Sequence, residues 1–410
     1  MLLWLFERLA AVWPDSAWAD RLPAFEKITL RASLAAVVSF MLAMFLGPRL
    51  IEWLRRRFRE PIKCDSARLC ELHRPKEATP TMGGLFLVAG LVGGVLLLAD
   101  LRNAYMHAAL VVTAGLAAVG AVDDLTKLRG TGKGLSARKK LLGQAAVATA
   151  AAVIVYHRHA ALPAALDLRI PLVQLDFPLG AFFLPLAVLV IVGASNAVNL
   201  ADGLDGLAGG CLLFAVAGMT VVAYAGGHAE LAEYLNLIGI PGSGELTVLS
   251  GGMIGGLLGF LWFNCHPAQV FMGDTGSLPL GGLLGLLAVV TRQELLLVLV
   301  GGVFVAEAAS VMLQVGSYKW RRRRVFLCAP LHHHFQFLGW PESRIVVRFW
   351  IASALCAILG LVSLKWNVHE ERPVSPESFS AVAKSVCPAG SRTRESSGKV
   401  PNSHEFGYEP

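Results

Sequence analysis

Five aspartates stand in three short motifs whose residue types could do chemistry. The motifs are AVDDLTK, SNAVNLADGLDG and FNCHPAQVFMGDTGS, and their aspartates are Asp123, Asp124, Asp202, Asp205 and Asp274. Carboxylates bind hard cations such as Mg²⁺, and they can orient a reacting group or accept its proton. A plainer structural role is open to each: a polar stop after an apolar helix, turn residues beside glycines, or a helix N-cap in the case of Asp274.

A second unusual stretch, LCAPLHHHFQFLGW at 327–340, holds the consecutive histidines His332, His333 and His334. Consecutive helical residues point about 100° apart, and in an extended chain the middle residue points away from its neighbours. A zinc ion shared by all three is therefore the weakest interpretation. A pH switch would fit the titration of histidine near neutrality, but nothing in the sequence specifies an element with two states. We favour substrate recognition, because imidazoles can donate hydrogen bonds to phosphate or sugar oxygens.

The elements that must position these residues are apolar. The 410-residue chain is 55% hydrophobic and 16% charged, and its mean hydropathy is +0.58, a balance that is typical of membrane proteins. Apolar runs long enough to cross about 30 Å of hydrocarbon recur along the chain. They predict an all-α polytopic membrane protein with transmembrane helices near residues 29–53, 82–100, 104–122, 140–156, 178–198, 206–225, 246–264, 276–291, 294–317 and 346–366.

Three regions follow from this pattern. Residues 1–27 hold three tryptophans and are interpreted as an interfacial leader, not a cleavable signal. Residues 28–366 form the transmembrane domain. Residues 367–410 are rich in Ser and Pro and contain no long apolar run, which predicts a disordered extracytoplasmic tail. Within the membrane domain, the partly alternating stretch 166–177 predicts a small extracytoplasmic β-hairpin.

Basic residues alternate from loop to loop. The predicted loops 54–81, 123–140 and 318–345 carry twenty Lys and Arg, whereas the four alternate loops that contrast with them carry four. The positive-inside rule places the basic loops in the cytoplasm. All three aspartate motifs, the histidine run and the segment RPKEATPTMGG at 74–84 then lie on that same face. Scattered solvated loops would not be expected to segregate in this way.

Acidic side chains at the mouths of membrane helices are costly unless a cation joins them. Lys127 and Lys140 can offset two of the five charges, and a divalent cation is the simplest partner for the rest. Oxygen ligands favour Mg²⁺ or Mn²⁺, and the seven scattered cysteines offer neither paired zinc spacing nor a disulfide ladder. Mg²⁺ usually binds together with substrate phosphates, so we expect phosphoryl transfer at the membrane surface. The sequence contains no P-loop or dinucleotide fingerprint.

At these motifs the chain closely resembles the phospho-N-acetylmuramoyl-pentapeptide-transferase family, within the polyprenyl-phosphate N-acetylhexosamine-1-phosphate transferase superfamily. The matching stretches are KEATPTMGG, AVDDLTK, LSARKKLLGQ, SNAVNLADGLDGLAGG, NCHPAQVFMGDTGSLPLGG and APLHHHFQFLGWPESRIVVRFW. The resemblance implies ten transmembrane helices, Mg²⁺ and an active site on the cytoplasmic face of the bacterial inner membrane. It implies transfer of phospho-MurNAc-pentapeptide from UDP-MurNAc-pentapeptide to undecaprenyl phosphate, giving lipid I and UMP. The resemblance is compatible with a homodimer, and no nucleic-acid partner is expected.

The family pattern also implies a role for each matched residue. Its catalytic positions fall on Asp123, Asp124, Asp274, Lys127 and Lys140, with Asp274 as the Mg²⁺ ligand. Its substrate-binding positions fall on Lys76, Thr79, Thr81, Asn199, Asp202, Asp205, Asn264, Phe271, His332, His333 and His334. Among these, Asp205 looks like a nucleoside contact and Phe271 looks placed to stack on uracil.

Departures from the family pattern are few. Ala78 stands where Gly is usual, Ala201 stands where Thr is usual, and Cys265-His266 stands where aromatic residues are common. These changes bear on loop flexibility and local hydrogen bonds, and they leave the implied reaction intact.

Two mechanisms and two other functions stay open at this point. We favour direct attack of the lipid phosphate on the β-phosphorus of the UDP-sugar, and a double displacement through an aspartyl-phosphate is the rival. The nearest other function is a related UDP-N-acetylglucosamine:polyprenyl-phosphate GlcNAc-1-phosphate transferase. A different class, an ion or solute transporter, would rest on the intramembrane acid Glu307.

Overall fold

The structure is a computed structural model, and it describes residues 25–57, 79–129, 134–162, 164–170 and 175–365, with residues 2, 4, 5, 8 and 12 near the N-terminus. These residues belong to one compact unit, Met1–Glu371, and a second unit, Arg372–Pro410, lies outside the described part. The predicted disordered tail and most of the predicted interfacial leader therefore fall outside the described residues.

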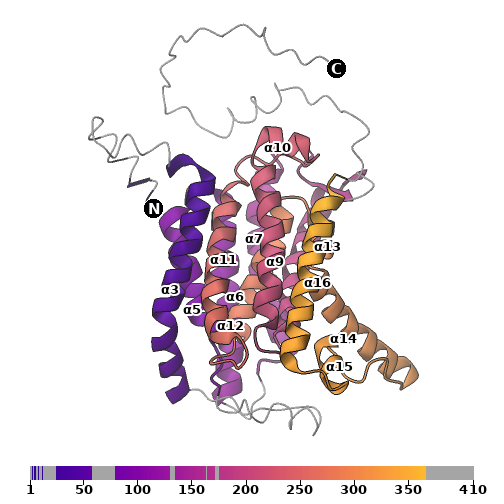
Figure 1. Cartoon of the computed structure of the whole chain (residues 1–410). Helices are drawn as coiled ribbons and strands as arrows, with labels where there is room; N and C mark the ends of the chain where they lie inside the picture. Colours follow the sequence, from indigo (N-terminus) through magenta and orange to yellow (C-terminus); the bar gives the residue numbers. More distant parts are fainter. Residues whose placement is uncertain are drawn as a thin grey trace, which may run out of the picture. The chain divides into compact units, whose positions relative to one another are not determined.

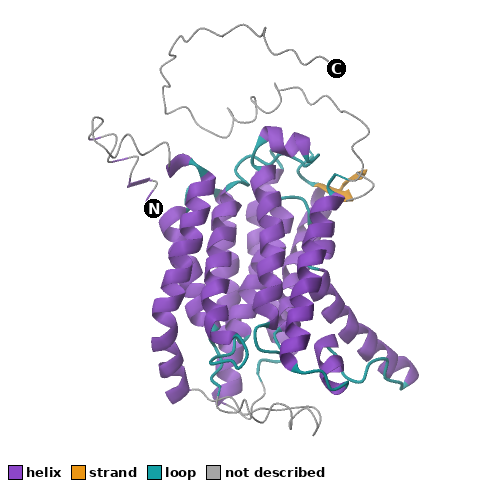
Figure 2. Cartoon of the chain, viewed as in Figure 1, coloured by secondary structure: helices purple, strands orange, loops and turns teal. Residues whose placement is uncertain are grey.

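Helices make up most of the described chain (Figure 2). In chain order they are α3 (Ile28–Arg57), α5 (Gly84–Leu98), α6 (Ala104–Arg129), α7 (Ala137–His159), the 3-10 turn η2 (Gly180–Phe182), α8 (Phe183–Ala201), α9 (Leu207–Gly226), α10 (Ala229–Tyr234), α11 (Glu245–Asn264), α12 (Asp274–Val290), α13 (Glu294–Val300), α14 (Gly302–Arg321), α15 (Leu331–Phe337) and α16 (Glu342–Ser363). Two strands, β1 (Asp167–Ile170) and β2 (Leu175–Pro178), pair in antiparallel fashion. The small β-hairpin predicted around 166–177 is therefore confirmed.

Seven of the described helices are at least 18 residues long and apolar enough to cross a membrane, namely α3, α6, α7, α8, α9, α11 and α16. The bent pair of α13 and α14 makes an eighth candidate within the described chain, and α5 and α12 are shorter apolar helices. Each apolar segment predicted from the sequence thus coincides with one of these helices or with the bent pair. The chain is a multi-pass, all-α membrane protein, as predicted.

One predicted span, 294–317, is not a single straight helix. Its two parts, α13 and α14, meet at an angle of 88° on either side of Gly301. Glycine has a low helix propensity, and the adjacent Gly301 and Gly302 favour a break here. The hydropathy pattern could not reveal the bend, because the residues on both sides of it are apolar. Beyond the bend, α14 slopes away from α16 toward the end of the bundle where α15 lies (Figure 1).

Two predictions of local structure are also wrong. Asp123 and Asp124 were expected in a loop after residue 122, whereas α6 continues through both of them. Lys127 lies one turn further along the helix and pairs with Asp123, an i,i+4 contact that stabilises the helix at this point. Asn199 was likewise expected in a loop, and it lies on α8.

Two central helices organise the core. Every residue of α12 is buried, and this helix contacts α5, α6, α8 and α9. Helix α11 packs against α3, α5 and α9. Its contact with α3 is close because glycines recur every fourth residue on one face of α11, where a Cβ would overlap the backbone or side chains of α3; they are Gly251, Gly255 and Gly259. Small residues at this spacing allow two membrane helices to approach closely.

A buried charged pair lies where α11 begins, at the end of the bundle that carries α10 (Figure 1). Arg31 of α3 donates from both terminal nitrogens to the carboxylate of Glu245, at 2.8 and 2.6 Å. The side chains are 5% and 10% exposed. Glu245 also accepts a hydrogen bond of 3.0 Å from the backbone of Asp100. The pair joins α3 to α11 and to the chain that follows α5.

Candidate active site

The last turns of α6 carry three charged residues that point toward the start of α12. The Nζ atom of Lys127 lies 2.8 Å from Asp123 Oδ2 and 3.7 Å from Asp124 Oδ1. The other oxygen of Asp123 accepts a hydrogen bond of 2.7 Å from the backbone of Leu135, which precedes α7. Both aspartates are 2% exposed. The two neighbouring carboxylates are therefore buried and held by different partners.

Asp124 caps the N-terminus of α12 from the neighbouring helix. Its carboxylate accepts hydrogen bonds from the backbone of Asp274 at 3.2 Å and from the backbone and hydroxyl of Thr275 at 2.9 and 2.7 Å. The first N–H groups of a helix have no partner within the helix, and a carboxylate placed there also favours the helix dipole. Gly273, the residue at the N-cap position, offers no side chain for this purpose. Asp124 thus fixes the position of Asp274.

Asp274 collects most of the remaining contacts. Its Oδ2 atom lies 3.2 Å from Lys127 Nζ and is also in contact with the Nζ atom of Lys140 on α7. Its Oδ1 atom accepts a hydrogen bond of 2.7 Å from the side-chain amide of Asn199, which also donates to Ser277 at 2.8 Å. We call Asp123, Asp124, Asp274, Lys127 and Lys140 the acid–lysine centre.

The acid–lysine centre has the composition of a cation site. Asp123, Asp124 and Asp274 each offer a carboxylate oxygen, and these oxygens lie within 4.8 Å of one another. Three carboxylates against two ammonium groups leave a surplus of one negative charge. The donors are all hard oxygens, which suit a divalent cation such as Mg²⁺ or Mn²⁺. The residues present therefore fit a metal ion bound together with an anionic substrate.

Asp202 adds a further acid beside this centre, at the start of the loop between α8 and α9. Asp202 is half-buried as a whole residue. Burial of the carboxyl group, together with the nearby carboxylates of Asp274 and Asp124, raises the pKa of Asp202 to about 7. Asp202 thus increases the local surplus of carboxylates and would become more acidic when a cation binds.

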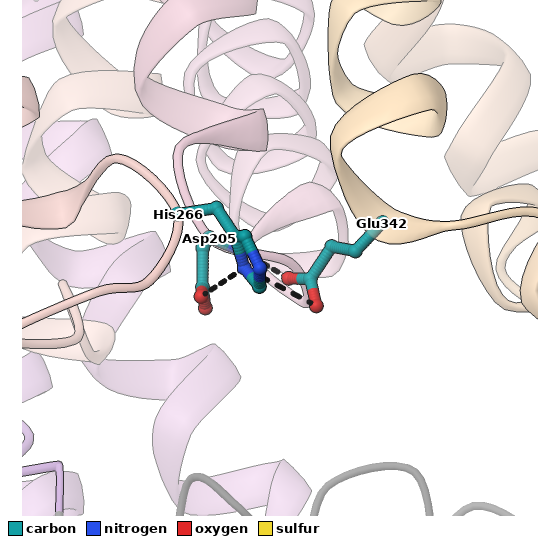
Figure 3. Close-up of side chains that lie close together, drawn as sticks. All are labelled: Asp205, His266 and Glu342. Atoms are coloured by element: carbon teal, nitrogen blue, oxygen red, sulfur yellow. Dashed lines mark hydrogen bonds and ion pairs between the residues drawn. The ribbon is translucent and has the colours of Figure 1, made fainter.

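The same loop carries Asp205, which enters a second cluster (Figure 3). Asp205 Oδ2 lies 3.1 Å from Nδ1 of His266 and accepts a hydrogen bond of 3.1 Å from the backbone of Ala268. Glu342, at the start of α16, accepts a hydrogen bond of 2.8 Å from the backbone of Asp205 and lies 3.9 Å from His266. The three ligand atoms lie within 4.8 Å of one another. This triad could hold a metal ion, but its hydrogen bonds account for the arrangement without one.

Asn264 and Trp350 hold the end of that loop. The amide oxygen of Asn264 accepts a hydrogen bond of 3.0 Å from the backbone of Gly206, and its nitrogen donates to the backbone of Val270 at 2.8 Å. The indole of Trp350 on α16 donates to the carbonyl of Gly206 at 3.1 Å. Loop 202–206 is therefore fixed between the acid–lysine centre and the loop that leads from α11 to α12.

The predicted substrate segment 79–81 lies along that second loop. The hydroxyl of Thr79 is 3.4 Å from the carbonyl of Ala268, and the backbone of Phe271 donates to the carbonyl of Pro80 at 2.9 Å. Thr81 is 3% exposed, whereas the ring of Phe271 is half-buried. Lys76, predicted for the same segment, lies outside the described residues.

The three histidines occupy one short helix, α15, and have three different environments. His332 is 1% exposed and lies against Glu307 of α14, with Nδ1 3.3 Å from Oε1. His333 Nδ1 lies 2.8 Å from the side-chain oxygen of Gln336. His334 Nδ1 accepts a hydrogen bond of 3.2 Å from the backbone of Leu327. Their helical spacing agrees with the expectation that no single ion is shared by all three.

The structure thus brings most of the predicted residues to one end of the bundle, and it adds others. His266, Glu342, Thr275, Ser277 and Trp350 contact predicted site residues although none was predicted. His266 had a sequence signal, since it belongs to a departure from the family pattern. Glu342 had a weaker signal, a carboxylate directly after Pro341 at the start of a helix.

Comparison with known proteins adds independent findings. Residues 106–292 match glycosyl transferase family 4. The chain is 47% identical over 360 residues to the phospho-N-acetylmuramoyl-pentapeptide-transferase of Solidesulfovibrio magneticus. The matched stretch covers 86% of this chain and 98% of that protein. The chain is 46% identical over 358 residues to the protein of the same name from Maridesulfovibrio salexigens, with the same coverage of each chain. All described residues of the acid–lysine centre lie within the stretch that matches glycosyl transferase family 4.

Proposed function

The chain belongs to the phospho-N-acetylmuramoyl-pentapeptide-transferase family, and we propose that it performs the reaction of that name in peptidoglycan biosynthesis. Phospho-MurNAc-pentapeptide passes from UDP-MurNAc-pentapeptide to undecaprenyl phosphate, and the products are lipid I and UMP. The acid–lysine centre is the observation that supports this proposal best, because it gathers three carboxylates and two ammonium groups at one end of a membrane helix bundle.

The proposed chemistry is a direct displacement at phosphorus. An oxygen of the lipid phosphate attacks the β-phosphorus of the UDP-sugar, the bond between that phosphorus and the bridging oxygen breaks, and UMP leaves. We assign to Asp123 the task of orienting the lipid phosphate or accepting its proton. A phosphate monoester is mostly dianionic at neutral pH, so this help is modest. A covalent aspartyl-phosphate on Asp123 is the rival route.

The lysines provide fixed positive charge for the phosphates. Lys127 contacts all three carboxylates of the centre, and Lys140 contacts Asp123 and Asp274. Both side chains are partly exposed, at 28% and 18%. A phosphate that enters from the exposed side would meet these ammonium groups first. Positioning and neutralisation of charge supply most of the catalysis in phosphoryl transfer, so little further chemistry is required of the protein.

We assign Mg²⁺ as the cofactor and Asp274 as its ligand. When bound, the ion neutralises charge on the pyrophosphate. Asp274 is held for this task by the cap that Asp124 places on α12 and by the amide of Asn199. Asp123 offers another carboxylate oxygen within 4.8 Å of that of Asp274.

The nucleoside end of the substrate is assigned to the loops beside the centre. Asp205 lies on loop 202–206, and the half-buried ring of Phe271 lies on the loop that enters α12. Asp205 would accept hydrogen bonds from the nucleoside, and Phe271 would stack on uracil. Three further predicted contacts, Thr79, Thr81 and Asn264, border the same loops.

The proposed setting is the bacterial inner membrane, with this end of the bundle in the cytoplasm, where the UDP-sugar is found. The alternation of basic loops in the sequence supports this orientation. The homodimer admitted by the sequence stays a prediction, and mass measurement of the purified protein in detergent would check it.

Release of UMP tests the proposal. Purified protein is incubated with undecaprenyl phosphate, with UDP-MurNAc-pentapeptide or UDP-N-acetylglucosamine, and with or without Mg²⁺. We expect Mg²⁺-dependent release from the muramoyl-pentapeptide substrate. Release from UDP-N-acetylglucosamine alone would establish the sister activity instead. Absence of release with either sugar would reopen the transporter interpretation, although Glu307, its best support, is paired with His332.

A further inference from the structure

Glu307 and His332 form a buried pair that no step of the proposed reaction uses. Glu307 lies on α14, shortly after the bend, and is fully buried, while His332 is 1% exposed. One oxygen of Glu307 accepts a hydrogen bond of 3.2 Å from the backbone of His332 and lies 3.3 Å from Nδ1 of its ring. The carboxylate thus faces both the start of α15 and one edge of the imidazole.

The opposite edge of the imidazole lies against loop 202–206. A Cβ atom added to Gly203 would overlap Nε2 of His332 and would lie 2.9 Å from its Cε1. Gly203 is flanked by Asp202, the acid next to the acid–lysine centre, and it stands two residues before Asp205. The ring therefore occupies the space that a side chain at position 203 would need, and only glycine leaves that space free.

Stability alone does not account for this pair. Oε2 of Glu307 and Nε2 of His332 lack a hydrogen-bond partner among the described residues, and Nδ1 of His332 faces Oε1 of Glu307 at 3.3 Å as a close contact without a hydrogen bond. A buried polar atom without a partner destabilises a fold, and a buried charge that is incompletely satisfied does so more strongly. The arrangement is better explained by what it does to the loop that the ring touches.

We propose that Glu307 is a positioning residue that acts through His332: it orients the imidazole, and the imidazole sets the position of loop 202–206. The inference rests on the proposed function, since the loop carries Asp205, which is assigned to the nucleoside, and Asp202, which lies beside the acid–lysine centre. It gives His332 a task distinct from those of His333 and His334, whose rings contact Gln336 and the backbone of Leu327. It also links the bent helix α14 to the nucleotide loop.

A double-mutant cycle tests this inference. The variants are Glu307→Gln, His332→Gln and the combination, assayed by UMP release at varied UDP-MurNAc-pentapeptide and at varied undecaprenyl phosphate. We expect Glu307→Gln to lower kcat/KM for the UDP-sugar by about 10- to 100-fold, a loss of the size found when a residue that orients a metal-bound histidine is removed. The KM for undecaprenyl phosphate should stay within about twofold. The double variant should lose little more than His332→Gln alone, because Glu307 acts on the loop through His332.

Two further variants separate this role from a structural one. Ser310→Ala is the matched control: Ser310 is 2% exposed on the same helix, and its hydroxyl donates to the backbone carbonyl of Glu307 at 2.7 Å, not to its carboxylate. It should leave both kinetic constants unchanged. Gly203→Ala should reproduce the loss in kcat/KM for the UDP-sugar without any change at Glu307, because the new Cβ displaces the ring.

The outcomes distinguish this inference from the proposed function. Additive losses in the double-mutant cycle, or unchanged kinetics in folded Glu307→Gln, would overturn the positioning role while the wild-type protein still released UMP. Should Glu307→Gln fail to fold, unchanged kinetics in Gly203→Ala would overturn it equally. Failure of the wild-type protein to release UMP from either UDP-sugar would instead contradict the proposed function itself.

Discussion

Two buried charged regions of this molecule differ in the ratio of positive to negative side chains. At the start of α11, one guanidinium meets one carboxylate through two hydrogen bonds, between Arg31 and Glu245. At the start of α12, two ammonium groups are shared among Asp123, Asp124 and Asp274. The first region is neutral, and the second has a surplus of negative charge before Asp202 is counted.

The difference separates a structural contact from a reactive one. A bidentate pair such as Arg31–Glu245 matches one positive charge with one negative charge through two fixed hydrogen bonds, and it joins helices that must stay together. In the acid–lysine centre one Nζ atom serves several oxygens, so each contact can be exchanged for a contact with a phosphate or a cation. A surplus of buried negative charge can be maintained at a site that binds a cation.

Removal of divalent cations should have the largest effect and should affect one region only. Treatment with EDTA is expected to lower UMP release by about 100-fold or more, and added Mg²⁺ should restore it, because the ion supplies several kcal/mol of charge stabilisation. Mg²⁺ should also raise the melting temperature of the wild-type protein by binding to the folded state. The same addition should leave the melting temperature of Asp274→Asn unchanged. An equal increase in both proteins would place the cation elsewhere.

Asp124→Asn should affect both stability and activity. The asparagine keeps one acceptor oxygen for α12, where the carboxylate serves two backbone N–H groups and the Thr275 hydroxyl. Loss of a helix cap costs about 1 kcal/mol, and displacement of Asp274 should lower kcat by about 10- to 100-fold. Thermal unfolding and UMP release measured on one preparation would check both. A variant that lost activity with an unaltered melting temperature would show that Asp124 reacts directly and does not act as a cap.

Glu245→Gln should have the smallest effect on activity. The variant leaves the guanidinium of Arg31 buried without its counter-charge, which destabilises a protein by about 3–5 kcal/mol. We therefore expect a clear fall in melting temperature, while kcat measured well below that temperature stays within about twofold. Arg31→Met with Glu245→Gln should recover part of the stability, since no buried charge then remains. Loss of kcat in folded Glu245→Gln would remove the distinction between the two regions.

Much of this arrangement could be predicted from the sequence, because the physics involved is local. Apolar runs predict membrane helices, and the alternation of basic loops brings the aspartate motifs to one face. The bend at Gly301 could not be predicted, since apolar residues on both sides give the same hydropathy as a straight span. The continuation of α6 through Asp123 was missed although the i,i+4 spacing of Asp123 and Lys127 favours a helix there. The cap that Asp124 gives to α12 could not be predicted, because it joins residues that are far apart in the sequence.

Contacts between distant parts of the chain were the hardest to predict. Asp205 meets His266 and Glu342, which are 61 and 137 residues away in the sequence. His332 lies against Gly203, which is 129 residues earlier in the sequence. No pattern of residue spacing along the sequence predicts such contacts. The three histidines looked equivalent in the sequence, and the fold gives each a different neighbour.

The most direct test of the account is the rate of UMP release by Asp274→Asn beside that of Glu245→Gln, each with UDP-MurNAc-pentapeptide, undecaprenyl phosphate and Mg²⁺. Both variants neutralise one buried carboxylate, and the two carboxylates lie at opposite ends of the bundle. The account predicts that Asp274→Asn loses about 10²- to 10³-fold in kcat while it remains folded, as is usual when an electrostatic contact to the transition state is removed. Glu245→Gln should retain nearly full kcat. Retention of activity by Asp274→Asn, or an equal loss in both variants, would contradict the assignment of the acid–lysine centre as the site of transfer.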